Sequence, residues 1–290
     1  MLVALASRDA ATAQNWCDEF GVPRAYGSYE ELLSDPEIDA VYIPLPNELH
    51  RRWVEAAANA GKHVLCEKPL ALDAAEARAM VAYCESRGVL LMEAFMWRHQ
   101  PRSAGVRACV NDGTLGDLRL VRSSFSFSID PGDWRLDPHR GGGALWDIGC
   151  YGVSTARFFA GCEPVSIRSR ARFGTTGVDL SLTAELAFPN GVLGLIDCSF
   201  EQPFRCRYEL VGTRGMIEVE NAYLPPAERS TARLTTDGAA QDLDFAPTNQ
   251  YACMVDAFSE AVATGRLTSP SENGLDQMIV LETILNAART

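Results

Sequence analysis

The sequence predicts two domains: an α/β domain with an incomplete, doubly wound parallel sheet, and an α+β domain with an open, mostly antiparallel sheet and helices. Over residues 1–98, short continuous apolar runs alternate with helical patterns, which is typical of parallel strands covered by helices on both faces. Over residues 99–290, apolar and polar residues alternate along the predicted strands, which is typical of antiparallel strands with one face in water.

Four apolar runs and the helices between them make up the first domain. Asp9, Asn47 and Asp73 are the expected N-caps of three helices, and the glycine after each helix is its stop signal. Strands are predicted at residues 2–6, 40–43, 63–66 and 89–92, and helices at 9–20, 47–60 and 73–87. This order is the doubly wound pattern.

A period of two marks the second domain, which begins after about Arg98. Residues 178–188 alternate between apolar and polar types, and a turn at 212–215 joins strands at 206–210 and 216–219. Asp237-Gly238 marks a further hairpin. Helical patterns at 251–264 and 272–288 close the chain.

Composition excludes several classes of protein. The chain of 290 residues is 47% hydrophobic and 22% charged, which is a globular composition. Its net charge of −12 argues against nucleic acid as a partner, because such proteins neutralise phosphates with basic residues. No apolar run reaches the roughly 18 residues that a membrane span requires. We therefore expect neither nucleic acid nor a membrane as a partner.

The nine cysteines indicate a reducing compartment. Their number is odd, their spacing is scattered and no CxxC occurs, so the sequence predicts no metal site and no redox dithiol. We interpret them as small buried residues of a cytoplasmic protein, with no visible signal peptide.

Glu67-Lys68-Pro69 stands at the end of the third predicted strand. Ligands bind at this carboxyl edge of open α/β sheets, and Lys68 there can donate a hydrogen bond or tune a neighbouring pKa. Taken alone, the motif is equally compatible with a lysine in a surface loop.

A second motif runs from Gly141 to Tyr151. Its three glycines allow close backbone approach, and Asp147 and Tyr151 are four residues apart, as on one face of a helix. Tyrosine exchanges a proton with a substrate hydroxyl when a cation lowers its pKa, and Lys68 is the candidate cation. The alternative is a purely structural role for the motif, with a glycine turn, an N-cap aspartate and a core tyrosine.

Together with residues 46–50 and 93–98, these motifs resemble the Gfo/Idh/MocA oxidoreductase family over essentially the whole chain. The resemblance implies a Rossmann nucleotide-binding domain at 1–98 and a substrate-binding and oligomerisation domain at 99–290. It implies hydride transfer between a nicotinamide and a sugar, polyol or dihydrodiol carbon. It also implies a homo-oligomer formed through the C-terminal sheet.

Tyr151 and Ser154 stand where many members carry histidine and an acidic residue, which is similar to the glucose–fructose oxidoreductase, dihydrodiol dehydrogenase and NADP-xylose dehydrogenase branch. By this resemblance Tyr151 is the acid/base. Lys68 lowers its pKa and holds the substrate oxygen, and Asp147 orients the reacting hydroxyl. Trp134 and Arg135 line the sugar pocket.

Ser7-Arg8 at the end of the first predicted strand favours NADP over NAD, because an arginine there pairs with a 2′-phosphate. NAD stays open as an alternative. The family's motifs assign further cofactor contacts to Pro46, Asn47, His50, Glu67, Lys68, Trp97 and Arg98.

No GxGxxG occurs in the chain, although the family carries it on a strand ahead of residue 2. Without that strand, the strands at 2–6 and 40–43 would each have an unpaired inner edge. We expect that the protein begins upstream, where an export signal would also lie. Two alternatives are a sheet that closes around the gap and a cofactor-deficient, non-catalytic sugar-binding or interaction protein. The main hypothesis is an NADP-dependent oxidoreductase acting on an aldose, such as xylose or glucose, or on a cyclic diol.

Overall fold

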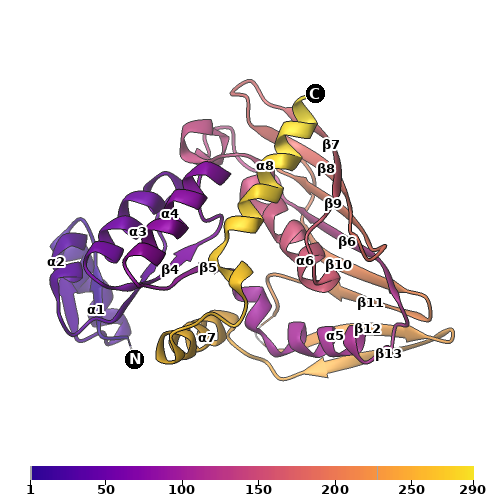
Figure 1. Cartoon of the computed structure of the whole chain (residues 1–290), viewed down its shortest axis with the longest axis horizontal. Helices are drawn as coiled ribbons and strands as arrows, with labels where there is room; N and C mark the ends of the chain where they lie inside the picture. The colour runs from indigo at the N-terminus through magenta and orange to yellow at the C-terminus, as the bar shows by residue number, and fades with distance from the viewer. Residues whose placement is uncertain (1, 227) are drawn as a thin grey trace.

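The computed structural model describes residues 2–226 and 228–290 (Figure 1). Its first part alternates strands and helices as predicted. The elements are β1 (Ala4–Ala6), α1 (Ala10–Phe20), β2 (Arg24–Tyr26), α2 (Tyr29–Ser34), β3 (Ala40–Ile43), α3 (His50–Asn59), β4 (His63–Glu67), α4 (Ala74–Ser86) and β5 (Leu91–Ala94). The sequence did not predict β2 and α2, because β2 is only three residues long and carries no apolar run.

The parallel strands form two separate sheets. One has the order β3-β4-β5, with Cys66 paired to Glu93, and the other contains β1 and β2 alone. Across the described residues no strand joins β1 to β3, so the sheet does not close at this position. The predicted unpaired inner edges are therefore confirmed for the described residues.

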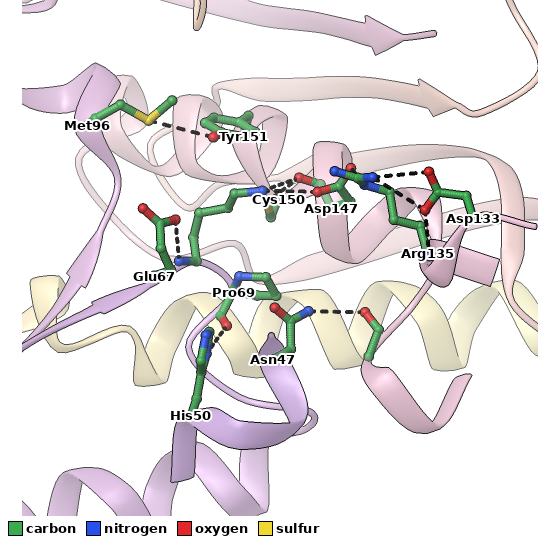
Figure 2. A network of polar contacts seen from close by, with 12 residues as sticks. Asn47, His50, Glu67, Pro69, Met96, Asp133, Arg135, Asp147, Cys150 and Tyr151 are labelled. Carbon is green, nitrogen blue, oxygen red and sulfur yellow. Dashed lines mark hydrogen bonds and ion pairs between the residues drawn. The ribbon is translucent and has the colours of Figure 1, made fainter. Parts of the chain in front are cut away.

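Helix caps follow the sequence at two of three predicted positions. The Asp9 and Asp73 side chains accept from Thr12 N and Glu76 N, each at 2.7 Å. The prediction for Asn47 is wrong. A 3₁₀ turn, η1 (Asn47–Leu49), precedes α3, whose N-cap is Leu49 with no side-chain bond. The Asn47 amide points instead toward the glycine run of the second domain (Figure 2).

One large sheet dominates the second part, in the order β13-β12-β11-β10-β6-β9-β8-β7, and only the β6–β9 pair is parallel. Asp237 and Gly238 turn β12 into β13 with φ values of 52° and 78°, as the hairpin prediction requires. The elements are α5 (Pro101–Asn111), β6 (Leu118–Ser126), α6 (Cys150–Ala160), β7 (Ser166–Phe173), β8 (Asp179–Ala187), β9 (Leu193–Ser199), β10 (Arg205–Gly212), β11 (Gly215–Glu220), β12 (Ser230–Thr236), β13 (Ala239–Phe245), α7 (Gln250–Thr264) and α8 (Leu275–Arg289).

Helices α5, α6 and α8 lie against one face of this sheet, between it and the parallel strands (Figure 1). Along β9, residues of even number such as Ile196 are buried against α6, whereas Leu193 and Leu195 are 44% and 37% exposed on the other face. Helix α6 packs on this covered face. The Asp147–Tyr151 segment at its N-terminal end therefore lies opposite the carboxyl edge of β3-β4-β5 (Figure 2).

Candidate active site

The two sequence motifs meet between the domains. Lys68 follows β4 and precedes a cis peptide bond to Pro69. Its Nζ donates to the backbone oxygen of Asp147 at 2.7 Å and to Asp147 Oδ1 at 3.2 Å. Both side chains are mostly buried, at 14% and 16% exposure, so water screens this ion pair weakly. The structure thus joins the two motifs through a Lys68–Asp147 contact that the sequence analysis did not predict.

Each carboxylate oxygen of Asp147 contacts one cation. Oδ2 accepts from Arg135 Nε at 2.8 Å, while Asp133 holds the far side of the same guanidinium (Figure 2). Asp147 lies in a π-helical turn, Leu145–Gly149, which runs directly into α6. Such turns widen a helix locally and occur often at functional sites. The carboxylate is thereby oriented from two sides.

Tyr151 is buried beside this network, with its hydroxyl 3.6 Å from Met96 Sδ (Figure 2). Lys68 Nζ lies 4.9 Å from the centre of the phenol ring. Burial raises the pKa of Tyr151 well above its ordinary value, and the Lys68 charge opposes that rise. Lys68 therefore acts in the predicted direction, which is to lower the pKa of Tyr151. Desolvation is the larger effect, so the pKa of Tyr151 is raised overall.

Burial also disfavours the charge of Lys68, but Tyr151 and Asp147 outweigh it and raise the pKa of Lys68 well above its ordinary value. Lys68 therefore stays protonated at neutral pH. A permanent cation beside a buried phenol stabilises the phenolate relative to the same phenol without it.

The ring of Tyr151 is held by aromatic neighbours that the sequence did not single out. Tyr223 stacks on it with centroids 4.8 Å apart, and Phe95 meets it edge-on at 5.6 Å. The Tyr223 hydroxyl bonds to Ser123 at 2.7 Å and to Thr155 at 2.8 Å. Tyr223 follows β11 without a recognisable motif, so only the folded structure places it here.

At each of the three glycines of the run, Gly141, Gly142 and Gly143, a side chain would collide with a neighbouring residue. A Cβ at Gly141 would come within 2.8 Å of Leu72 Cδ2 in the first domain, and one at Gly142 would collide with the backbone oxygen of Arg135. Gly143, with φ at +121°, lies directly against the Asp179 carboxylate. Gly141 therefore allows contact with the first domain, whereas Gly142 and Gly143 allow close packing against other segments of the second domain.

Trp134 and Arg135, the predicted sugar-pocket residues, lie at this site and are half-buried. The Trp134 ring has the guanidinium carbons of Arg135 and Arg140 at 5.0 and 5.2 Å from its centre. Arg140 Nε in turn donates to Glu48 Oε1 at 2.9 Å. The segment before the glycine run is thus tied both to Asp147 and to the loop after β3.

Three predicted cofactor residues make contacts inside the fold. His50 is fully buried, with Nε2 2.8 Å from Leu45 O and Nδ1 3.1 Å from both Pro69 O and Leu70 O. Trp97 is fully buried among aromatic rings, and within residues 2–226 and 228–290 its indole nitrogen has no hydrogen-bond partner. Arg98 is half-buried, its Nε donates to Ser154 at 2.9 Å, and burial lowers the pKa of Arg98 to about 10. Contact of these three residues with a cofactor stays a prediction.

Three other predicted cofactor residues, Ser7, Arg8 and Glu67, lie at the ends of parallel strands. Ser7 and Arg8 follow β1, and within residues 2–226 and 228–290 no carboxylate oxygen lies within 4.0 Å of the exposed Arg8 guanidinium. Asp9 is occupied by its capping bonds to Thr12, so it does not neutralise Arg8. Glu67 follows Cys66 at the carboxyl edge, where it accepts from Tyr42 at 2.6 Å.

Helix-covered parallel strands, with Lys68 at the carboxyl edge of β3-β4-β5 bonded to Asp147 and beside Tyr151, are typical of a nucleotide-dependent oxidoreductase. Comparison with protein families agrees. Residues 1–95 match the model of the oxidoreductase family with an NAD-binding Rossmann fold, and residues 104–218 match the GFO/IDH/MocA C-terminal domain. The chain belongs to the Gfo/Idh/MocA family of oxidoreductases, as the sequence motifs predicted.

Relatives in that family act on sugars and diols. The chain is 41% identical to D-xylose 1-dehydrogenase (NADP(+)) 2 of Haloferax volcanii, over 99% of this chain and 89% of that protein. It is 40% identical to the human trans-1,2-dihydrobenzene-1,2-diol dehydrogenase, over 78% of this chain and 68% of that one.

Solved structures give the same fold. An aldose-aldose oxidoreductase from Caulobacter crescentus, complexed with glycerol, matches with a TM-score of 0.91 and 32% identity over 100% of this chain and 90% of that one. A 3-ketoreductase from Actinomadura kijaniata, in complex with NADP and TDP-benzene, matches with a TM-score of 0.88 and 32% identity, over 98% and 89% of the two chains.

Among the described residues, no helix is both long enough and apolar enough to cross a membrane.

Proposed function

We propose that this protein transfers hydride between NADP and a hydroxyl-bearing carbon of a sugar, an aldose such as xylose or glucose, or of a cyclic diol. The observation that carries the proposal is the contact of Lys68 Nζ with Asp147 beside the buried Tyr151 ring. A general acid/base, a fixed cation and an oriented carboxylate are what proton removal from an alcohol requires.

Arg8 and Ser7 are proposed to hold the 2′-phosphate, because an unpaired guanidinium binds phosphate with charge-assisted hydrogen bonds. Pro46, Asn47, Glu67 and Lys68 are proposed to face the nicotinamide end, since they follow β3 and β4 at one sheet edge. The bound nicotinamide supplies the hydride acceptor or donor. We propose that residues 1–98 form the nucleotide-binding domain and residues 99–290 the substrate domain.

The chain's own groups then handle the proton. In oxidation, the Tyr151 phenolate oxygen takes the proton of the substrate hydroxyl, and in reduction the Tyr151 hydroxyl donates a proton to the carbonyl oxygen of the substrate. Lys68 stabilises the charge on both oxygens, while the Asp147 carboxylate accepts a hydrogen bond from the substrate and fixes its orientation. Trp134 and Arg135 border the same space. A bound hydroxyl gives Tyr151 a better acceptor than the Met96 thioether, so we expect that contact to be replaced.

Replacement of Lys68 by methionine tests this mechanism. Lys68→Met keeps the aliphatic stem and removes the charge, so turnover of NADP⁺ with D-xylose should fall by about 10² or more. NADPH fluorescence titration on the same variant separates lost chemistry from lost binding. Turnover equal to that of the wild type would overturn the assigned roles of Lys68 and Tyr151.

We further propose a homo-oligomer formed through the open face of the eight-stranded sheet, and a cytoplasmic location. Exposed Leu193 and Leu195 support the first proposal, and nine free cysteines support the second. Leu195→Glu should convert the oligomer to a monomer in size-exclusion chromatography with light scattering. A monomeric wild type would contradict the first proposal.

A further inference from the structure

We propose that Glu93 is a positioning residue for Lys68, acting through the backbone amide of Leu70; the inference rests on the proposed function of Lys68. Glu93 lies at the carboxyl end of β5, paired in register with Cys66 of β4. Its Oε1 accepts the Leu70 N–H at 3.0 Å. Lys68 precedes Leu70 by two residues, so this hydrogen bond holds the backbone next to the proposed catalytic lysine.

The backbone between Leu70 and Lys68 has few free torsions, so fixing the Leu70 amide also restricts the position of Lys68. The peptide planes on both sides of Pro69 are rigid, and the proline ring fixes its own φ. Only one free torsion, the ψ of Pro69, therefore separates the Leu70 nitrogen from the Cα of Lys68. A group that fixes the Leu70 amide also restricts where the Lys68 side chain begins, and so restricts its reach to Asp147.

The loop is held from a second direction by His50. Its Nδ1 lies 3.1 Å from Pro69 O (Figure 2) and 3.1 Å from Leu70 O, while Glu93 accepts a hydrogen bond from the Leu70 N–H. Leu70 itself is fully buried. The carbonyl and amide sides of the segment are therefore held by different elements, α3 and β5.

Glu93 is costly for the fold. It is 4% exposed, and within residues 2–226 and 228–290 no cationic nitrogen lies within 4.0 Å of its carboxylate. The backbone at Gly274 closes the other side, since a Cβ there would come 3.1 Å from the Glu93 Cβ and Cδ. An apolar side chain of similar volume would avoid the penalty of burying a carboxyl group. The hydrogen bond to the Lys68 loop is the specific contact that such a replacement would lose.

The charged surroundings make this contact sensitive to pH. Burial raises the pKa of Glu93 to about 7, against the opposing charges of Arg98 and Arg157. Glu67 and Cys66 on β4, and Cys150 on α6, face the same carboxyl. Ionised Glu93 forms a stronger, charge-assisted bond to Leu70 N–H than neutral Glu93 does. Lys68 is therefore held more firmly above neutral pH than below it.

Two variants test the proposal. Glu93→Met removes both the charge and the acceptor at nearly constant volume. We expect its melting temperature to equal or exceed that of the wild type, the Leu70 amide to exchange hydrogen about tenfold faster or more, and kcat to fall about tenfold with KM for the sugar little changed. Glu93→Gln keeps an acceptor without charge, and should abolish the rise of kcat through neutral pH.

Glu76→Gln is the matched control. Its Oε2 accepts from Leu72 N at 2.8 Å, which is the same kind of bond four residues beyond Lys68 but on a half-exposed side chain. It should leave kcat and its pH profile unchanged. Unchanged Leu70 exchange in Glu93→Met, or faster exchange with an unchanged kcat, overturns the positioning role. A wild type without turnover contradicts the proposed function, and the exchange measurement then still decides whether Glu93 holds the loop.

Discussion

Replacement of Asp179 by asparagine should raise the free energy of unfolding relative to the wild type, and the difference should grow as the pH rises. Asp179 begins β8 and is 2% exposed, and its Oδ2 accepts from Leu145 N at 2.7 Å, at the start of the π-helical turn. Burial raises the pKa of this carboxyl from 3.8 to about 7, with the backbone bonds opposing the shift. An acid whose pKa is raised by folding contributes stability below its unfolded pKa and loses it as the pH rises through the folded one.

The size of the effect follows from the shift. Raising the pKa from 3.8 to about 7 corresponds to roughly 4 kcal/mol of unfolding free energy, lost between about pH 4 and pH 7. Asp179→Asn is neutral at every pH and keeps an oxygen for Leu145 N. The variant should equal the wild type at the acid end and exceed it by up to about 4 kcal/mol near pH 8.

Urea unfolding at several pH values measures this difference directly, provided that the m-values of the two proteins agree. Asp39→Asn, at an exposed carboxyl, is the control and should show no pH-dependent difference. A stability difference between Asp179→Asn and the wild type that stays constant from acid to alkaline pH would refute the reasoning.

Two further predictions concern the cofactor and the glycine run. Arg8→Ala should weaken NADPH binding by about tenfold or more and leave NADH binding nearly unchanged, because only NADPH carries the 2′-phosphate that this guanidinium is proposed to bind. Fluorescence titration measures both affinities, and equal losses would exclude a 2′-phosphate contact. Gly143→Ala should cost at least about 2 kcal/mol of unfolding free energy, because φ is +121° and the new methyl meets Asp179. Gly161→Ala, at φ +71° with open space around it, is the control and should cost less in the same urea titration.

Local signals in the sequence predicted most of the fold. Asp73 bonds to Glu76 N as an N-cap, and Asp237-Gly238 turns a hairpin, because these depend on neighbours a few residues away. Asn47 fits the same capping pattern, yet its amide bonds to Gly141 O, 94 residues along the chain. A cap and a domain contact require the same side chain, so sequence alone does not separate them.

The site was predictable in its centre and not in its surroundings. Lys68 and Asp147 are 79 residues apart but belong to recognisable motifs. Tyr223 and Glu93 belong to none that assigns them a role at the site, and they act through burial and through contacts that only packing creates. Burial likewise affects Tyr151, whose pKa rises because desolvation exceeds the opposing effect of Lys68.

Turnover by the wild type and by Tyr151→Phe tests the central claim most directly. Each protein is mixed with NADP⁺ and, in turn, D-xylose, D-glucose and trans-1,2-dihydrobenzene-1,2-diol, and NADPH formation is followed by its absorbance. The wild type should reduce NADP⁺ with at least one of them, and Tyr151→Phe should lower kcat by about 10² or more while binding NADPH as tightly. Equal turnover by the two proteins, or none by the wild type with any of these compounds, would contradict the account.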